Sequence, residues 1–141
     1  MVILDTDMVS ILLRASSPER NRLLDRLEPI PLQEKATTII SYEEQTRGWL
    51  SYAKKAANQA QVIEAYLKLK HHLDGYCKML VLKFDQLAAI EFQRLRKQAL
   101  RIGTMDLRIA AIALAHNAML LSRNLSDFRK VPGLTVEDWT T

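Results

Sequence analysis

The chain has 141 residues, 48% of them hydrophobic, and a formal net charge of +4 from 20 basic and 16 acidic side chains. This size predicts one domain, residues 1–141, with a sizeable core, and the modest charge permits contact with a polyanion without demonstrating it. No run approaches the roughly 20 apolar residues of a membrane span. The N-terminus lacks the basic leader of a signal peptide, and a single cysteine excludes an internal disulfide, so we expect a cytoplasmic protein without a membrane partner.

The N-terminal quarter of the chain predicts one strand and two helices. The apolar run from Val2 to Leu4 is typical of a short buried strand. A helix is expected over Asp7 to Arg14, with Thr6 or Asp7 as its cap. A second helix is expected from Pro18 to about Leu27, because Ser17 is a favourable cap and proline suits the first helical position.

The middle of the chain predicts two strands around a long helical region. The β-branched stretch Thr37 to Ser41 favours a strand. The region from 42 to 76 contains no proline and weakens near 56–58, which predicts two helices, expected to be antiparallel. A third strand is expected over Lys78 to Phe84.

The last third continues the alternation of helix and strand. Asp85 is placed to cap a helix whose expected core face comprises Ala88, Phe92, Leu95 and Ala99. Asp106 begins a helix that is apolar on nearly all sides. Strands are expected over Met119 to Leu121 and, at a sheet edge, over Leu134 to Val136.

Strands that alternate with helices predict an α/β fold with helices on both faces of a parallel sheet of four to five short strands. The strands are apolar without alternation, which is typical of strands buried on both sides. Functional sites in such sheets form beyond the carboxyl ends of the strands. Asp5 occupies such a position, since it directly follows the first strand.

Further polar residues follow the other expected strands. Glu43 and Glu44 follow the second strand, and Asn124 and Asp127 follow the fourth, while the helix opened by Asp106 leads into the fourth strand. We expect acids from these distant segments to converge. Clustered carboxylates without basic partners repel one another unless a cation binds or some stay protonated. Oxygen ligands alone suit Mg²⁺ or Mn²⁺, which serve phosphate chemistry.

Each acid also has an ordinary structural interpretation. Asp106 is placed to cap a helix, Asp127 to close a surface turn, and Glu43 or Glu44 to lie on a solvated helix face. Asp5 is the hardest to interpret in this way, because it abuts a buried strand. Composition and periodicity leave these alternatives open.

Four blocks of the chain, in order, resemble the PIN-domain ribonucleases and, within them, the VapC-type toxins of toxin–antitoxin systems. The blocks are LDTD, TTIISYEEQTRG, IGTMDLRIAAIALAHNAMLLSRNLSDF and VPGLTVEDW. In the second block the resemblance selects Glu44 over Glu43, because the glutamate of the family stands four residues before a glycine, here Gly48. The resemblance spans essentially the whole length and implies a PIN-like three-layer α/β/α sandwich.

The resemblance also implies a site and an activity. Asp5, Glu44, Asp106 and Asp127 would form the catalytic metal site, which Ser122, Asn124 and Thr6 would line. The order of Asn124 and Asp127 around the metal stays open, and Asp7 is expected to cap the first helix rather than join the site. The implied activity is Mg²⁺- or Mn²⁺-dependent hydrolysis of RNA phosphodiester bonds.

The family further implies a homodimer and a small cognate antitoxin. The helix pair within residues 42–76 would grip the antitoxin or RNA, or form the dimer. RNA phosphates would be held by some of the basic side chains, for which the candidates are Arg47, Arg94, Arg96, Lys97, Arg101, Arg108 and Arg123.

Two other functions are compatible with parts of the pattern. Haloacid-dehalogenase-like phosphatases also begin with a strand followed by Asp-x-Asp, as in Asp5-Thr6-Asp7, but this chain lacks a good block for their last acidic motif. A non-catalytic PIN-like module that binds RNA or protein is the second alternative, and the presence of all four acids argues against it.

Overall fold

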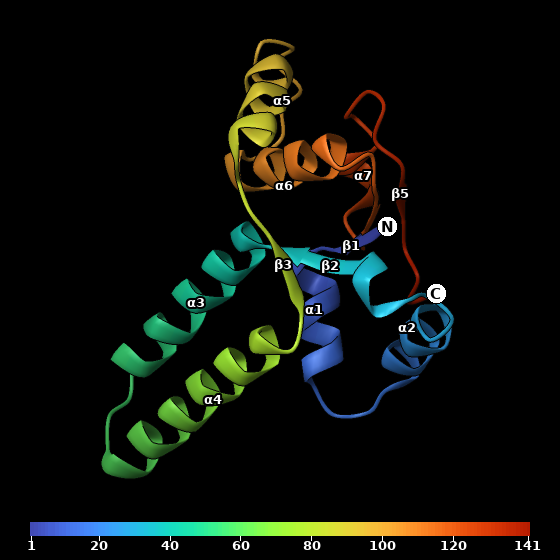
Figure 1. Ribbon diagram of the computed structural model, residues 1–141. Coiled ribbons are helices and arrows are strands. Elements are labelled where there is room, and N and C mark those ends of the chain that lie inside the picture. The colour runs from blue at the N-terminus through green and yellow to red at the C-terminus, as the bar shows by residue number, and fades with distance from the viewer.

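A computed structural model describes all 141 residues and contains one five-stranded sheet in the order β3-β2-β1-β4-β5 (Figure 1). Every pair of neighbouring strands is parallel. This confirms the predicted α/β class with a parallel sheet. The strands are β1 (Val2–Leu4), β2 (Lys35–Thr38), β3 (Leu80–Leu82), β4 (Met119–Leu121) and β5 (Val136–Glu137).

Helices connect the strands and cover both faces of the sheet. They are α1 (Thr6–Leu13), α2 (Pro18–Leu27), α3 (Ile39–Lys54), α4 (Gln59–Cys77), α5 (Gln86–Arg96), α6 (Thr104–Ala115) and the single turn α7 (Leu125–Phe128), with a 3₁₀ turn at Leu32–Glu34. The second helix has its predicted bounds, and the hydroxyl of Ser17 accepts a hydrogen bond from the Arg20 amide. The fifth begins after the predicted cap, Asp85, which accepts from the Ala88 amide.

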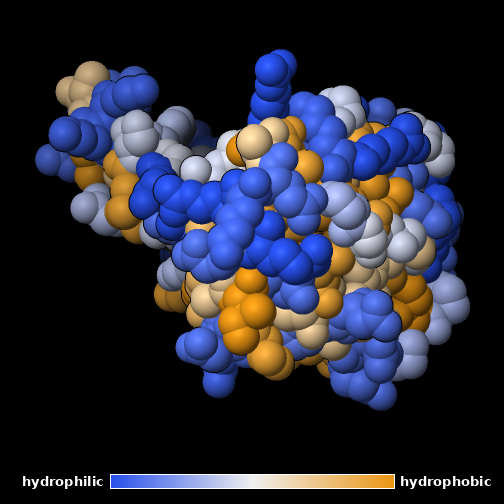
Figure 2. Space-filling model, turned by 90° about the horizontal axis from the view of Figure 1, so that it is seen from above, coloured by the Kyte–Doolittle hydropathy of each residue, from blue (hydrophilic) through white to orange (hydrophobic).

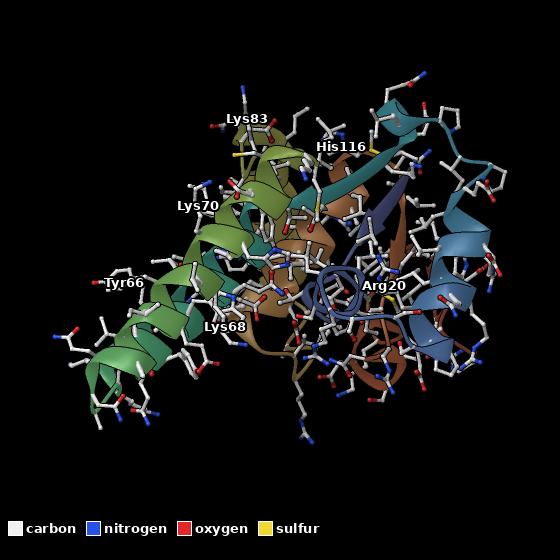
Figure 3. All side chains as sticks on the ribbon, turned by 90° about the horizontal axis from the view of Figure 1, so that it is seen from below. Arg20, Tyr66, Lys68, Lys70, Lys83 and His116 are labelled. Atoms are coloured by element: carbon white, nitrogen blue, oxygen red, sulfur yellow. The ribbon has the colours of Figure 1, made fainter.

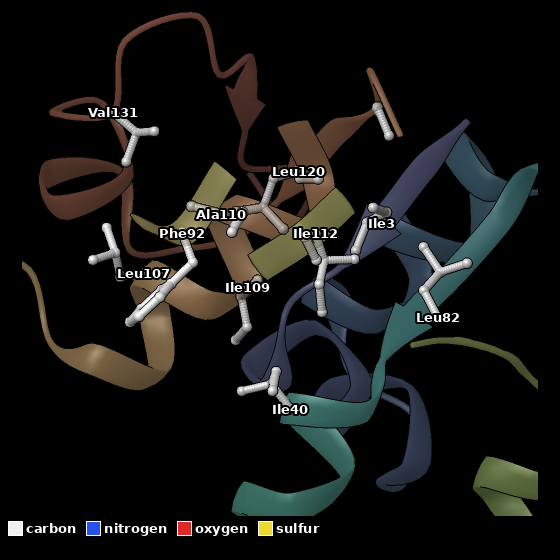
Figure 4. Packing of buried hydrophobic residues seen from close by; sticks show 14 of the residues in the cluster. Ile3, Ile40, Leu82, Phe92, Leu107, Ile109, Ala110, Ile112, Leu120 and Val131 are labelled. Carbon is white, nitrogen blue, oxygen red and sulfur yellow. The ribbon is translucent and has the colours of Figure 1, made fainter. Parts of the chain in front are cut away.

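The two faces of β1 divide the core into two layers. Ile3 packs with α5, α6 and α7, where Ile109 and Ile112 of α6 are fully buried (Figure 4). Val2 and Leu4 point to the other face and pack with α1, α2 and the end of α4. Alternate side chains of a strand lie on opposite faces. The apolar run VIL therefore packs against helices on both faces of the sheet, as predicted for a strand buried on both sides.

Helices α3 and α4 form an antiparallel pair that extends away from the sheet (Figure 1). This confirms the predicted division of the long helical region near residues 56–58. Tyr66, Lys68 and Lys70 lie along α4 on this extension (Figure 3). The pair joins the body where Tyr42, His72 and Tyr76 pack ring against ring.

The prediction for the start of α1 was wrong. The helix begins at Thr6, and its N-cap is Asp5, whose carboxylate accepts a hydrogen bond from the Thr6 amide at 2.8 Å. Neither Thr6 nor Asp7 is the cap. A single residue, Asp5, separates the strand from the helix and serves as the helix cap.

The prediction for the second strand was wrong in its bounds. β2 covers Lys35–Thr38, and the two isoleucines after it already belong to α3. Thr38 caps α3 by accepting from the Ser41 amide at 3.1 Å. A threonine cap ends the strand here despite the β-branched residues that follow, because it satisfies an amide at the helix start that would otherwise lack a partner.

Smaller corrections concern the ends of other elements. β3 is shorter than predicted, and β5 begins at Val136 rather than Leu134, although it does lie at the sheet edge. Ala99 is exposed and not part of the core face of α5, because the helix ends at Arg96 and Ala99 has a positive φ of 50°. None of the helices combines the length and the apolar character needed to traverse a bilayer.

Candidate active site

Asp5 is a buried carboxylate held at the carboxyl end of the central strand, with only 6% of its surface exposed. One oxygen accepts from the Thr6 amide, and the other accepts from the Ser122 hydroxyl at 2.7 Å. Ser122 in turn accepts from the Asn124 amide at 3.0 Å. Since Ser122 directly follows β4, which pairs with β1, the order of the sheet brings together two segments that are far apart in the sequence.

Glu44 reaches the same end of the sheet from the second turn of α3. Thr6 Oγ1 lies 3.0 Å from a Glu44 oxygen and 3.0 Å from Ser41 Oγ. An ionised carboxylate only accepts, so the Thr6 hydroxyl donates to Glu44 and accepts from Ser41. Thr6 therefore links the start of α1 to the acid on α3, as expected of a residue that lines the site.

Asp106 and Asp127 approach from α6 and α7, with Asn124 between them. The Asn124 side-chain amide lies 3.4 Å from Asp106 Oδ2 and 3.1 Å from Asp127 Oδ2. Asp106 lies in the first turn of α6, whose N-cap, Gly103, offers no side-chain cap. Asp106 is thus not the cap of this helix, and its carboxylate faces Asn124 instead.

The acids raise one another's pKa values. Burial raises the pKa of Asp5 to about 7, and the charges of Asp7 and Asp106 add to the effect. Burial also raises the pKa of Glu44, where Asp106 contributes, and that of Asp106, where Asp127 contributes. These mutual effects indicate that the carboxylates occupy one electrostatic environment, as predicted for acids that converge at the strand ends.

Asp127 differs from the other three acids. Hydrogen bonds from Asn124 and from Lys130, whose ammonium lies 3.2 Å away, lower its pKa. Asp127 therefore stands at the rim of the cluster with a cation of its own. Asp106, half-buried and without a cationic partner, lies between this rim and Asp5.

Asp7 does not cap α1, contrary to our expectation. One carboxylate oxygen accepts from the Arg123 amide at 2.9 Å, and the other is buried without any hydrogen-bond partner. Burial raises its pKa, and its charge contributes to the raised pKa values of Asp5, Glu44 and Asp106. Asp7 therefore adds negative charge beside the four acids that the sequence singled out.

The chemistry of this donor set suits a hard divalent cation. The side chains offer carboxylate, hydroxyl and amide oxygens, and the only cation in an ion pair with one of the four acids is Lys130 at the rim. The buried Asp7 oxygen without a partner indicates unsatisfied negative charge. As placed, no three His, Cys, Asp or Glu side chains are grouped closely enough to hold a metal; hydroxyl and amide groups separate the acids instead.

Residues of α3 and α4 that sequence analysis missed hold Thr6 in position. Tyr76 of α4 donates to Gln45 at 2.6 Å, and the Gln45 amide contacts the Thr6 carbonyl. Ser41 positions Thr6, as described above. Thr6 itself was expected to line the site, whereas Ser41, Gln45 and Tyr76 become recognisable only once α3 and α4 are folded against α1.

The predicted basic residues divide into two groups. Arg47 pairs with Glu43, and Arg94 pairs with Glu91 at 2.6 Å. The pair with Arg47 places Glu43 on the outer surface of α3, in agreement with the choice of Glu44. The remaining candidates make no ion pair, and these are Arg96, Lys97, Arg101, Arg108 and Arg123.

Comparison with known proteins gives similarity to VapC proteins in sequence and in fold. No family model matches the chain. It is 42% identical over 45 residues to ribonuclease VapC2 of Rickettsia felis, which covers 32% of the chain and 34% of that protein. It is 33% identical over 72 residues to the tRNA(fMet)-specific endonuclease VapC of Salmonella typhimurium, which covers 48% of the chain and 54% of that protein. The matches thus span about a third to a half of these relatives.

The fold similarity extends over the full length. VapBC2 of Rickettsia felis, solved with a promoter DNA fragment, gives a TM-score of 0.75 at 22% identity, with 99% of each chain covered. VapBC-1 of nontypeable Haemophilus influenzae gives 0.70 at 26% identity, with 100% of each covered. The chain therefore has the three-layer α/β/α fold of the PIN-domain proteins. The predicted resemblance to their VapC group is confirmed.

Proposed function

We propose that this chain is a Mg²⁺- or Mn²⁺-dependent endoribonuclease and the toxin of a type II toxin–antitoxin pair. The observation that carries the proposal is the convergence of Asp5, Glu44 and Asp106, with raised pKa values, at the carboxyl end of a parallel sheet. The names of the similar proteins, ribonuclease and tRNA-specific endonuclease, support the choice of RNA.

In this proposal Asp5, Glu44, Asp106 and Asp127 hold the cation, and Ser122, Asn124 and Thr6 keep these acids in place. When bound, Mg²⁺ or Mn²⁺ lowers the pKa of a water molecule and neutralises charge that develops on the phosphate. A bound cation offsets the mutual repulsion of these acids and favours their ionised form. Their role is to position and to accept charge, not to attack phosphorus.

The reaction is hydrolysis. A water oxygen forms a bond to phosphorus, the bond from phosphorus to the 3′ oxygen breaks, and the departing 3′ oxygen takes up a proton. The products are a 5′-phosphate and a 3′-hydroxyl. The buried Asp5 and the half-buried Glu44 and Asp106 concentrate negative charge where the cation is needed, whereas Asp127, paired with Lys130, lies at the rim.

The proposed partners are a cognate antitoxin and a second copy of this chain. Solved structures of similar fold are complexes named VapBC, which supports an antitoxin for this chain. The pair α3 and α4 offers a surface for either partner, because Leu50, Ile63 and Leu67 on it are more than half exposed.

The test is cleavage of a panel of defined RNAs by the wild-type protein in Mg²⁺ or in EDTA. We expect cleavage in Mg²⁺ alone and its loss in Asp106→Asn, since one ligand charge is removed while the shape is kept. Cleavage that survives EDTA, or equal rates for wild type and Asp106→Asn, would contradict the proposal.

Glu44 and Glu43 provide a matched pair of variants on one helix. Glu44→Gln should abolish cleavage, whereas Glu43→Gln should leave it unchanged, because Glu43 pairs with Arg47 on the surface. If every variant and the wild type bind RNA equally with or without Mg²⁺ and none cleaves it, the chain is a binding module instead.

A further inference from the structure

A cavity of about 370 Å³ lies between α5 and α6, next to the segment that connects them. Its apolar side includes Phe92, Leu95 and Leu107, and the side chain of Arg108 lies over the Phe92 ring, with its guanidinium carbon 5.7 Å from the ring centre. Arg96 and Arg101 also line the cavity. Three arginines, from α5, from the connecting segment and from α6, therefore line one hollow.

None of these three arginines has an acidic partner. Arg96, Arg101 and Arg108 make no ion pair, whereas Arg94 on the same helix as Arg96 pairs with Glu91. No acidic residue lines the cavity. Like charges in a hollow with apolar walls repel one another and create a positive field that favours an anion. Seen from above, the molecule carries many hydrophilic side chains interspersed with hydrophobic patches (Figure 2).

The segment that lines the cavity leads into the helix of Asp106, since Thr104 and Asp106 both lie in the first turn of α6. Lys130 provides a second connection, because its ammonium lies 3.2 Å from Asp127 and 3.4 Å from the backbone carbonyl of Arg101. A chain of phosphates that passes the acids can therefore continue into the cavity.

We propose that Arg96, Arg101 and Arg108 form a subsite for a backbone phosphate of the RNA strand, one or more nucleotides away from the bond that is cleaved. Arginine suits this role because its planar fork donates two parallel hydrogen bonds to phosphate oxygens. The proposal rests on the proposed ribonuclease function and adds to it which of the basic residues hold the strand. Arg47 and Arg94 are excluded, since carboxylates already occupy them.

The test is binding of a fluorescein-labelled single-stranded RNA in EDTA, followed by anisotropy over a range of salt concentrations. Each phosphate contact to a single strand contributes about 0.7 to the slope of log affinity against log salt. The variant Arg96→Gln with Arg101→Gln should bind more weakly, with a slope reduced by about 1.4. Arg94→Gln should match wild type, and the variant Arg96→Lys with Arg101→Lys should recover most of the slope.

The double glutamine variant and Arg94→Gln are each compared with wild type by thermal unfolding. This comparison distinguishes a loss of the fold from a loss of phosphate contacts. Equal slopes for wild type and the double glutamine variant, or an equal loss in Arg94→Gln, would overturn the subsite. Capture of mononucleotide or inorganic phosphate at these arginines without any effect on RNA binding would also overturn it. Asp106→Asn, which should bind RNA without cleaving it, tests the ribonuclease function separately.

Discussion

Asp5 has two structural roles that the sequence did not separate. It caps α1 through the Thr6 amide, and it directs its second oxygen to Ser122 at the end of the neighbouring strand. A cap on the surface has an ordinary pKa, because water solvates its charge. Asp5 is buried among other acids, and its pKa is raised to about 7. The metal-free protein therefore carries an electrostatic cost at this residue.

The first prediction concerns the pH dependence of stability in EDTA. The folded pKa of Asp5, about 7, lies above its ordinary value of 3.8, so the folded state retains a proton that the unfolded chain releases. The contribution of Asp5 to stability is complete below about pH 4 and is lost as the pH rises through 7. Asp5→Asn should remove this dependence and stabilise the metal-free protein at pH 8 by up to about 4 kcal/mol.

The measurement is denaturant unfolding of both proteins at pH 4 and at pH 8. Asparagine keeps an oxygen that accepts from the Thr6 amide, so the cap is preserved. Asp25→Asn, on the exposed surface of α2, is the control and should leave the free energy of unfolding unchanged at both pH values. An equal loss of stability between pH 4 and pH 8 in wild type and in Asp5→Asn would contradict a raised pKa of Asp5.

At the scale of elements, α3 contains a glycine that its helix does not require. Gly48 lies in the interior of α3, and nothing lies within 4 Å of the position that a Cβ would occupy. Glycine in a helix costs about 1 kcal/mol relative to alanine. Gly48→Ala should therefore stabilise the protein by about 0.5–1 kcal/mol, as measured by the midpoint of urea unfolding.

The matched control for Gly48 is a glycine whose conformation is special. Gly133 has a φ of +80°, which disfavours any residue with a Cβ, so Gly133→Ala should destabilise the protein although the site has room. If Gly48→Ala also destabilises, α3 bends or packs at this position in a way that the folded contacts do not explain.

Elements were predictable where a local signal defines their ends. Ser17 and Asp85 cap the helices that follow them, and both were recognised because a cap acts on amides within three residues. Ile39 to Ser41 were misread as strand residues, although Thr38 ends the strand and caps α3. The β-branched isoleucines favour a strand locally, but where the chain leaves the sheet depends on the tertiary structure. The core face of α5 was overextended to Ala99, because the helix ends at Arg96 and Ala99 has a positive φ.

At the scale of the whole molecule, the parallel sheet places acids from four segments at one end. A cation that binds only this folded arrangement must stabilise the fold. At a Mg²⁺ concentration 100 times Kd the stabilisation is about 2.7 kcal/mol. Addition of Mg²⁺ should therefore raise the Tm of the wild-type protein, and EDTA should reverse this rise; differential scanning calorimetry measures both.

The same calorimetry on Asp106→Asn supplies the control, since loss of one carboxylate should reduce the rise or abolish it. An equal rise in Tm for both proteins would place the bound cation elsewhere on the molecule. No rise in the wild type at any Mg²⁺ or Mn²⁺ concentration would argue against the cation site itself.

The sequence by itself determined the apolar strand that runs into Asp5, the alternation of strands and helices and several helix caps. These features depend on interactions between residues that are close in the chain. Only the tertiary structure decided that Asp7 joins the acidic environment of Asp5, Glu44 and Asp106, and that Ser122 holds the carboxylate of Asp5. These outcomes depend on strand order and on helix packing, which bring together charges from distant segments and set how far burial strengthens them.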